Sequence, residues 1–215
     1  MTEGFDKQSF IRRYPELALD PNPYAHPNKY VRGAYWKRLE IALDLAPPTA
    51  KRILDFGTGP GVFLVLASKR FSEVVGLDGK LSVISKKIVL NEKLSNVTLV
   101  QADGTHTGFK GGSFDVVFAL DVLEHFHEPE EGLAEIKRLL KPGGTLVISA
   151  PTENWLYETY RVVFGRQKPA DHYHDSNRVL SAASSFFEQG SERGVPFDLP
   201  APLSFFRVKA FKKPG

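Results

Sequence analysis

The sequence predicts an α/β protein in which a mostly parallel, doubly wound sheet carries helices on both faces. Between residues 51 and 151, short and nearly continuous apolar runs alternate with stretches of helical periodicity, and a glycine-rich turn joins the first run to the helix behind it. Continuous apolar runs are typical of strands that helices cover on both faces. A strand–helix–strand order gives parallel strands joined by right-handed crossovers.

The elements follow in order along the chain. Apolar residues at near-helical spacing predict a helix over 29–45, which Pro47 and Pro48 stop. We expect strands at 52–56, 73–77, 97–102, 114–120 and 144–150, and helices at 62–69, 80–93 and 129–140. Beyond these, we expect helices at 155–164 and 178–188 and a last strand at 203–212, whereas 189–202 shows no clear pattern.

Length and composition indicate one domain over residues 1–215, since 215 residues suffice for one full α/β core. The net charge of +3 comes from 28 basic and 25 acidic residues, and this balance does not favour a nucleic-acid partner. The absence of cysteine excludes disulfides and thiolate nucleophiles. Residues 1–10 lack the apolar core of a signal peptide, and no apolar run reaches the roughly 18 residues of a membrane span, so we expect a cytoplasmic protein.

The segment 55–61 reads DFGTGPG and joins the first predicted strand to the next helix. Glycines let the backbone turn tightly and let a ligand approach the main chain, and free N–H groups at the helix start favour an anion. In open α/β sheets, ligands bind outside the carboxyl ends of the strands, where this loop lies. A dinucleotide-binding loop has its third glycine after two intervening residues. Here Gly61 comes one residue early and Val62 holds the dinucleotide position, which argues against a nicotinamide cofactor.

With Asp55 two residues before Gly57, the pattern Asp-x-Gly-x-Gly-x-Gly resembles motif I of the class I S-adenosylmethionine-dependent methyltransferases. The run FDVVFAL at 114–120 matches the Phe-Asp-x-Val strand of that family, and LKPGGTL at 140–146 follows in the same order. The resemblance covers residues 51–151 and is similar to the small-molecule branch that includes quinone-biosynthesis and sugar-modifying methyltransferases.

The resemblance implies a Rossmann-like fold with seven strands in the order 3-2-1-4-5-7-6, the last one antiparallel. It divides the chain into an N-terminal helical cap (1–50), a cofactor-binding core (51–151) and acceptor-side helices and final strands (152–215). It implies S-adenosyl-L-methionine as the cofactor, with S-adenosyl-L-homocysteine as the product. The implied cofactor-binding residues are Asp55, Gly57, Thr58, Gly59, Gly61, Asp78, Asp103, Gly104 and Leu120.

Three carboxylates have distinct expected roles. Asp78 ends the second strand, where two acceptor oxygens match the two ribose hydroxyls. In the family, the position of Asp103 accepts the adenine amino group, and that of Asp55 helps to organise the amine end of the cofactor. Structural readings stay open: Asp55 as a cap of the turn, Asp78 as an N-cap and Asp103 as a loop acid. The segment 141–144, Lys-Pro-Gly-Gly, is interpreted as a helix stop and turn.

Methyl transfer to a neutral oxygen or nitrogen needs a proton acceptor, and the end of the fourth strand is the place for one. We expect His125 as that base, because imidazole titrates near neutral pH. His127 and Asp121 are alternatives, and His125 could instead hold its loop by hydrogen bonds.

The acceptor pocket is expected from residues outside the common core, because aromatic side chains with polar tips can wall a small-molecule site. The expected acceptor-side residues are Tyr24, Tyr30, Asp121, Tyr157, His172 and His174. Trp36 is expected to pack the first long helix onto the sheet. The basic residues Arg12, Arg13, Arg32, Lys37 and Arg38 are interpreted as a solvated face. The pair His172 and His174 could ligate a metal, but we prefer a part in shaping the acceptor pocket and predict no metal site.

The sequence also bears on three other functions. A nicotinamide-dependent oxidoreductase conflicts with the glycine spacing. A non-catalytic subunit that binds S-adenosylmethionine has the same cofactor residues, and nothing in the sequence favours it. A nucleic-acid base methyltransferase often has an Asn/Asp-Pro-Pro-aromatic signature after the fourth strand, where residues 121–124 here read DVLE, so no nucleic-acid partner is expected. The motifs specify the donor and leave the acceptor and the oligomeric state open.

Overall fold

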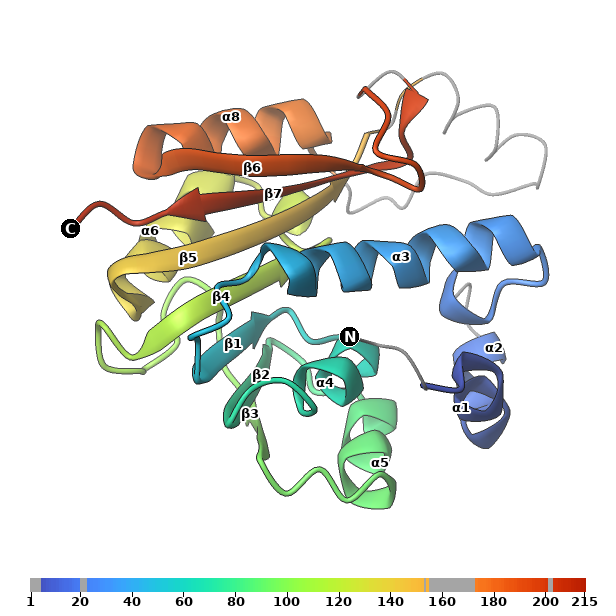
Figure 1. Cartoon of the computed structure of the whole chain (residues 1–215). Coiled ribbons are helices and arrows are strands. Elements are labelled where there is room, and N and C mark those ends of the chain that lie inside the picture. The colour runs from blue at the N-terminus through green and yellow to red at the C-terminus, as the bar shows by residue number, and fades with distance from the viewer. Residues whose placement is uncertain (1–4, 20–22, 153, 155–172, 201–202) are drawn as a thin grey trace.

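A computed structural model describes residues 5–19, 23–152, 154, 173–200 and 203–215. Within these residues, seven strands form one sheet in the order β3-β2-β1-β4-β5-β7-β6 (Figure 1). The strands are β1 (Arg52–Phe56), β2 (Glu73–Asp78), β3 (Val97–Gln101), β4 (Phe114–Leu120), β5 (Leu140–Pro151), β6 (Glu188–Val195) and β7 (Phe206–Lys212). The strands from β3 to β5 run parallel, and β7 runs antiparallel to both of its neighbours. The predicted fold class and strand order are confirmed.

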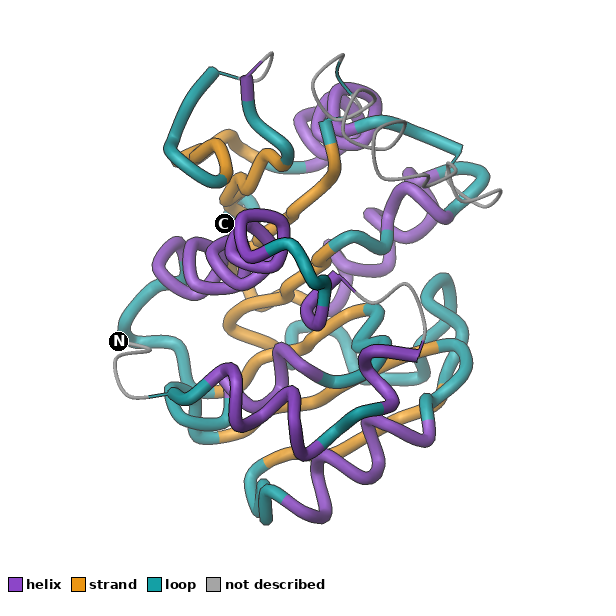
Figure 2. The backbone as a smooth tube through the Cα atoms, turned by 90° about the vertical axis from the view of Figure 1, so that its right-hand side faces the viewer, coloured by secondary structure: helices purple, strands orange, loops and turns teal. Residues whose placement is uncertain are grey.

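Helices cover both faces of this sheet (Figure 2). The helices and short 3-10 turns are α1 (Lys7–Arg13), α2 (Glu16–Leu19), η1 (Pro23–Ala25), α3 (Lys29–Leu45), α4 (Val62–Ala67), α5 (Val83–Asn91), η2 (Leu123–His125), α6 (Pro129–Leu139) and α8 (Ser176–Phe186). One apolar core lies under α1, α3, α4 and α5, and a second lies under α6 and α8. Successive strand residues point to opposite faces, so Ile53 joins the first core and Leu54 the second.

Most predicted boundaries in the core hold to within a few residues, and the exceptions have local causes. The helix expected at 80–93 begins at Val83, because Asp78 Oδ1 accepts the N–H of Lys80 and Ser82 caps the helix through the N–H of Ile84. Strand β5 starts at Leu140 rather than at residue 144, since Leu140 already pairs with Phe114 before an irregularity in register. The turn expected at 141–144 lies within that irregularity, where Gly143 has φ 68.

The last part of the chain differs more from expectation. Helix α8 begins two residues early, because Asp175 Oδ1 caps it by accepting the N–H of Arg178 at 2.9 Å. It ends at Phe186, and Glu188 already pairs with Lys212 as the start of β6. Strand β7 begins at Phe206, three residues later than expected. The helix expected at 155–164 lies outside the described residues.

The N-terminal segment packs against α3. Trp36 is buried, its ring lies 5.5 Å from that of Tyr24 and 6.1 Å from that of Phe10, and its Nε1 donates to Tyr24 O. These contacts bury Trp36 and join α3 to α1 and η1. No helix in the described part of the chain is long and apolar enough to cross a membrane.

Candidate functional site

The glycine-rich loop between β1 and α4 takes a conformation that few side chains allow. Gly57, Gly59 and Gly61 have φ values of 80, 50 and 82, all in the left-handed region. The N–H groups of Gly57 and Thr58 both donate to Leu77 O, at 2.8 and 2.9 Å, which ties the loop to the end of β2. A Cβ atom at Gly57 would come within 2.7 Å of Val122 Cβ. The loop therefore needs glycine at position 57 for space as well as for conformation.

Asp55 stabilises this loop through a hydrogen bond with Thr58. It is almost fully buried, and Thr58 Oγ1 donates a 2.6 Å hydrogen bond to its Oδ2. Burial raises the pKa of the Asp55 carboxyl to about 7, against the lowering effect of the Thr58 hydrogen bond, and the negative charge of Asp78 adds to the rise. The carboxyl thus holds the turn through Thr58, which is the structural role that the sequence left open.

Two other predicted carboxylates lie at the ends of neighbouring strands. Asp78 Oδ2 accepts the N–H of Gly59 at 2.8 Å, so β2 and the loop are linked a second time. Asp103 follows β3, and its Oδ1 accepts both the N–H and the Oγ1 of Thr105, at 2.8 and 2.9 Å. These hydrogen bonds from Thr105, the backbone one first, lower the pKa of Asp103. Both carboxylates can accept hydrogen bonds from a ligand.

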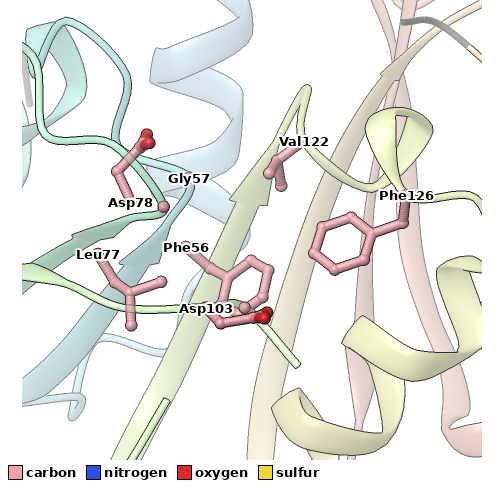
Figure 3. A pocket seen from close by; sticks show the side chains of 9 residues that line it. Phe56, Gly57, Leu77, Asp78, Asp103, Val122 and Phe126 are labelled. Carbon is pink, nitrogen blue, oxygen red and sulfur yellow. The ribbon is translucent and has the colours of Figure 1, made fainter. Parts of the chain in front are cut away.

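A first cavity of about 420 Å³ opens between these strand ends (Figure 3). Its lining residues are Phe56, Gly57, Leu77, Asp78, Gly79, Asp103, Gly104, Val122 and Phe126. The rings of Phe56 and Phe126 are stacked with centroids 6.1 Å apart. A Cβ at Gly104 would approach both rings to 2.8 and 2.9 Å, so glycine is needed there for close packing. The cavity combines flat apolar walls with two carboxylates.

A second cavity of about 290 Å³ lies between the glycine-rich loop, α3 and the end of β4. Its lining residues are Tyr24, Tyr35, Arg38, Leu39, Asp55, Gly57, Thr58, Gly59, Pro60, Val62, Phe63, Leu120 and Asp121. Gly57 lines both cavities, so the two are neighbours across the loop. Of the expected acceptor-side residues, Tyr24 and Asp121 line this cavity, as does the expected cofactor contact Leu120.

The polar centre of the second cavity is Arg38, which the sequence placed on a solvated face. That expectation is wrong: Arg38 is 3% exposed, forms an ion pair with Asp121 and donates from Nη2 to Tyr24 OH. Asp121 follows β4 with φ 56, and its Oδ1 accepts the hydroxyl of Ser149 at 2.7 Å. The spacing carried a signal for this, because Arg38 lies four residues from the buried Ala34 and Ala42, on the same face of α3.

The remaining expected residues lie apart from these cavities. Tyr30 is 72% exposed and lines neither cavity, so its expected place in the acceptor pocket is not supported. His125 is half-buried in η2, also outside both linings. His127 stacks on Tyr173 with centroids 4.0 Å apart, and His174 Nε2 lies 2.9 Å from His127 O. These contacts join the start of α8 to the loop after β4.

Two expected acceptor-side residues, Tyr157 and His172, lie outside the described residues. Among the residues that the structure describes, no group of three or more histidine or acidic side chains is placed to hold a metal ion.

Comparison with known proteins agrees with this geometry. Residues 54–148 match the methyltransferase domain family. The chain is 33% identical over 144 residues to a demethylmenaquinone methyltransferase from Thermus thermophilus, covering 62% of this chain and 63% of that protein. It is 30% identical over 150 residues to a ubiquinone biosynthesis O-methyltransferase from Thiobacillus denitrificans, covering 67% and 63%. The chain thus spans less than two thirds of the length of these curated relatives.

Among solved structures, the N-methyltransferase NodS from Bradyrhizobium japonicum, in complex with S-adenosyl-L-homocysteine, superposes with a TM-score of 0.67. The alignment covers 98% of this chain and 100% of that one at 16% identity, which is a likeness of fold.

Proposed function

We propose that this protein is a class I S-adenosylmethionine-dependent methyltransferase and that it transfers a methyl group from that donor to a small-molecule acceptor by in-line displacement. The match of residues 54–148 to the methyltransferase domain family supports the proposal. The observation that carries the proposal is the pair of cavities that meet at Gly57. One has the chemistry for a nucleoside and the other, beside the glycine-rich loop, has room for an amino-acid end and a reacting centre. The names of the curated relatives, which include quinone-biosynthesis methyltransferases, support a small-molecule acceptor.

The first cavity fits an adenosine. Asp78 already accepts two N–H bonds, from Gly59 and Lys80, but an ionised carboxylate has about four acceptor sites. It therefore keeps capacity for the two ribose hydroxyls. The apolar walls of Phe56 and Phe126 suit a flat base, and Asp103, with Gly104 beside it, stands where an acceptor for an exocyclic amino group is needed.

The second cavity lies next to the part of the site where transfer would occur. The bound donor supplies a methyl group on a positively charged sulfur, which needs no further activation. The chain's own tasks are then to hold the two reactants in line and to exclude water. Leu120 contributes an apolar wall at the end of β4, while Gly57, Gly59 and Gly61 let the main chain approach the ligand.

An oxygen or nitrogen acceptor would also lose a proton, and we retain His125 as the candidate base, with Asp121 as the alternative that lines the second cavity. A base role predicts that His125→Ala lowers turnover and leaves the affinity for S-adenosyl-L-homocysteine unchanged. Unchanged turnover would remove His125 from the mechanism and leave Asp121 as the group to test.

The activity is tested by mass spectrometry of S-adenosyl-L-homocysteine formed from S-adenosyl-L-methionine, with a panel of hydroxylated aromatic compounds, amines and amino sugars as acceptors. We expect product formation that depends on one acceptor class and is lost in Asp78→Asn. The matched control is Glu73→Gln, which changes a carboxylate at the opposite end of the same strand. Product formation that survives in Asp78→Asn would contradict the proposed site.

A further inference from the structure

Two residues that lead into α8 contact the segment that follows β4, from Val122 to His127. The N–H of Tyr173 donates to Glu124 O at 3.0 Å, and the ring of Tyr173 stacks on that of His127 with centroids 4.0 Å apart. His174 Nε2 lies 2.9 Å from His127 O, and since a carbonyl oxygen can only accept, this nitrogen is the donor. Tyr173 and His174 therefore hold the segment at three points, and we call these two residues the clamp.

The segment that the clamp contacts has little regular structure of its own. It contains one 3-10 turn, η2, in which the N–H of His125 donates to Val122 O at 3.1 Å and that of Phe126 to Leu123 O at 3.3 Å. A single 3-10 turn has poorer hydrogen-bond geometry than an α-helix, and these two bonds are long. Contacts from outside the segment therefore help to set its backbone.

The same segment supplies two walls of the first cavity. Val122 and Phe126 both line it, and the ring of Phe126 stacks with that of Phe56 (Figure 3). Phe126 directly precedes His127, so the clamp contacts the backbone beside this ring. Because a shift of the backbone at 122–127 would carry the ring with it, the shape of the cavity depends on a contact between residues 47 positions apart.

The clamp is carried by a helix that is itself fixed. Asp175 Oδ1 caps α8 by accepting the N–H of Arg178 at 2.9 Å, and Arg178 Nη1 lies 2.7 Å from Glu130 Oε1 at the start of α6. Helices α6 and α8 also share one apolar core under the sheet. The start of α8 is thus a firm base from which two side chains can hold a neighbouring segment.

We propose that Tyr173 and His174 are positioning residues for the cofactor, because they hold the segment 122–127 and so set Phe126 at the wall of the nucleoside cavity. Neither belongs to the residues that line this cavity, so both act through Phe126. This inference rests on the proposed function, since it takes a nucleoside in the first cavity as given. Coupling of this kind is reciprocal: the factor by which the clamp strengthens ligand binding is the factor by which a bound ligand tightens the clamp.

Calorimetric titration of the full chain tests the effect of the clamp on binding. The ligands are S-adenosyl-L-homocysteine and 5′-methylthioadenosine, which has the same nucleoside without the amino-acid end. Tyr173→Ala removes the stacked ring and keeps the backbone hydrogen bond, whereas Tyr173→Phe keeps both. We expect Tyr173→Ala to weaken both ligands by the same factor, about two- to tenfold, the range for one aromatic pair. Tyr173→Phe should bind as the wild type does. The control Phe197→Ala, which removes an exposed aromatic side chain outside both cavities, should leave both affinities unchanged.

Amide hydrogen exchange at Tyr173, read by NMR, tests the reciprocal effect. This amide donates to Glu124 O, so its exchange rate reports how often the clamp opens. We expect saturating S-adenosyl-L-homocysteine to slow this exchange in the wild type by about two- to tenfold, the same range as the binding effect. A residue that only stabilises the fold would lower the free energy of unfolding in Tyr173→Ala and leave both the ligand affinity and the ligand-dependent exchange unmoved.

The exchange measurement uses the wild type, so the inference stays falsifiable if Tyr173→Ala does not fold. Affinities that change by less than twofold in Tyr173→Ala, or exchange at Tyr173 that the ligand does not slow, would overturn the inference. An equal loss in Tyr173→Phe and Tyr173→Ala would overturn the part assigned to the stacked ring. Failure of the wild type to bind S-adenosyl-L-homocysteine would instead overturn the proposed function, and the inference with it.

Discussion

Replacing Gly57 by alanine tests whether the glycine-rich loop is held by space as well as by conformation. The alanine methyl would meet Val122 Cβ at 2.7 Å and its Cγ2 more closely still, and the backbone there has φ 80. A left-handed conformation costs an L-residue about 1–2 kcal/mol, and overpacking adds about 1–3 kcal/mol. We therefore expect Gly57→Ala to lower the free energy of unfolding by about 2–5 kcal/mol.

Gly59 offers a matched control on the same loop. It also has a left-handed backbone, with φ 50, but a Cβ atom there would have no heavy atom within 4 Å beyond its chain neighbours. Gly59→Ala should thus cost only the conformational part, about 1–2 kcal/mol. Urea denaturation at equilibrium, read by tryptophan fluorescence and circular dichroism, measures both variants.

A second-site change separates the two causes within Gly57→Ala. Val122→Ala removes Cγ2, the nearest atom, so Gly57→Ala should cost less in that background than in the wild type. A steric contact with Val122 would be contradicted by a Gly57→Ala variant that loses no more stability than Gly59→Ala, or by a Val122→Ala background that recovers none of the loss.

Two pH-dependent predictions follow from buried carboxyls. The pKa of Asp55 is raised from 3.8 to about 7, so its contribution to stability is complete below pH 3.8 and is lost as pH rises through about 7. Asp55→Asn, which stays neutral, should gain on the wild type between pH 4 and pH 7 in urea denaturation; parallel curves would contradict the burial argument. Glu135 shows the opposite shift: hydrogen bonds from Arg138 and then from Thr107 lower its pKa from 4.5 to about 2. The contribution of Glu135 to stability is therefore present above pH 4.5 and is lost as pH falls through about 2. Glu135→Gln should cost about 1.5–3 kcal/mol at pH 7 and less near pH 3, and a constant difference across that range would count against the assignment.

The positions of the three carboxylates that we expect at the cofactor site could be predicted because their determinants are local. Asp55 lies one residue before the end of β1, Asp78 ends β2 and Asp103 follows β3. Parallel strands bring their carboxyl ends to one edge of the sheet. The tight turn at Gly57 is likewise set within a few residues. The pattern therefore predicted the fold and the edge of the sheet at which the glycine-rich loop and these carboxylates lie.

The second cavity depends on contacts that the sequence pattern does not express. Arg38 is buried because Tyr24, Tyr35 and Phe206, from three separate parts of the chain, surround it. Its ion-pair partner, Asp121, follows a strand far along the chain, so neither residue alone indicates the pair. Tyr30 differs from expectation in the opposite way. It lies near the start of the predicted helix and was expected in the acceptor pocket, but its side chain is exposed.

The residue range of strand β6 could not be predicted from the hydrophobic pattern, because its composition is that of a surface loop. Its sequence, EQGSERGV, has six exposed residues and neither alternation nor an apolar run. It is a strand because β7 supplies an edge with which it pairs, and Arg207 and Lys209 form ion pairs with Glu192 across that edge. Strands at a sheet edge that are held by backbone pairing carry little hydrophobic signal.

The most direct measurement of the central claim is the dissociation constant of S-adenosyl-L-homocysteine by isothermal titration calorimetry, for the wild type, Asp78→Asn and the control Glu73→Gln. Asp78 accepts the N–H of Gly59 and lines the first cavity. We therefore expect one-to-one binding that Asp78→Asn weakens by at least about tenfold, the effect of one hydrogen bond to a charged group. Glu73→Gln should leave this binding unchanged. Equal binding by Asp78→Asn and the wild type, or no binding by the wild type, would contradict it.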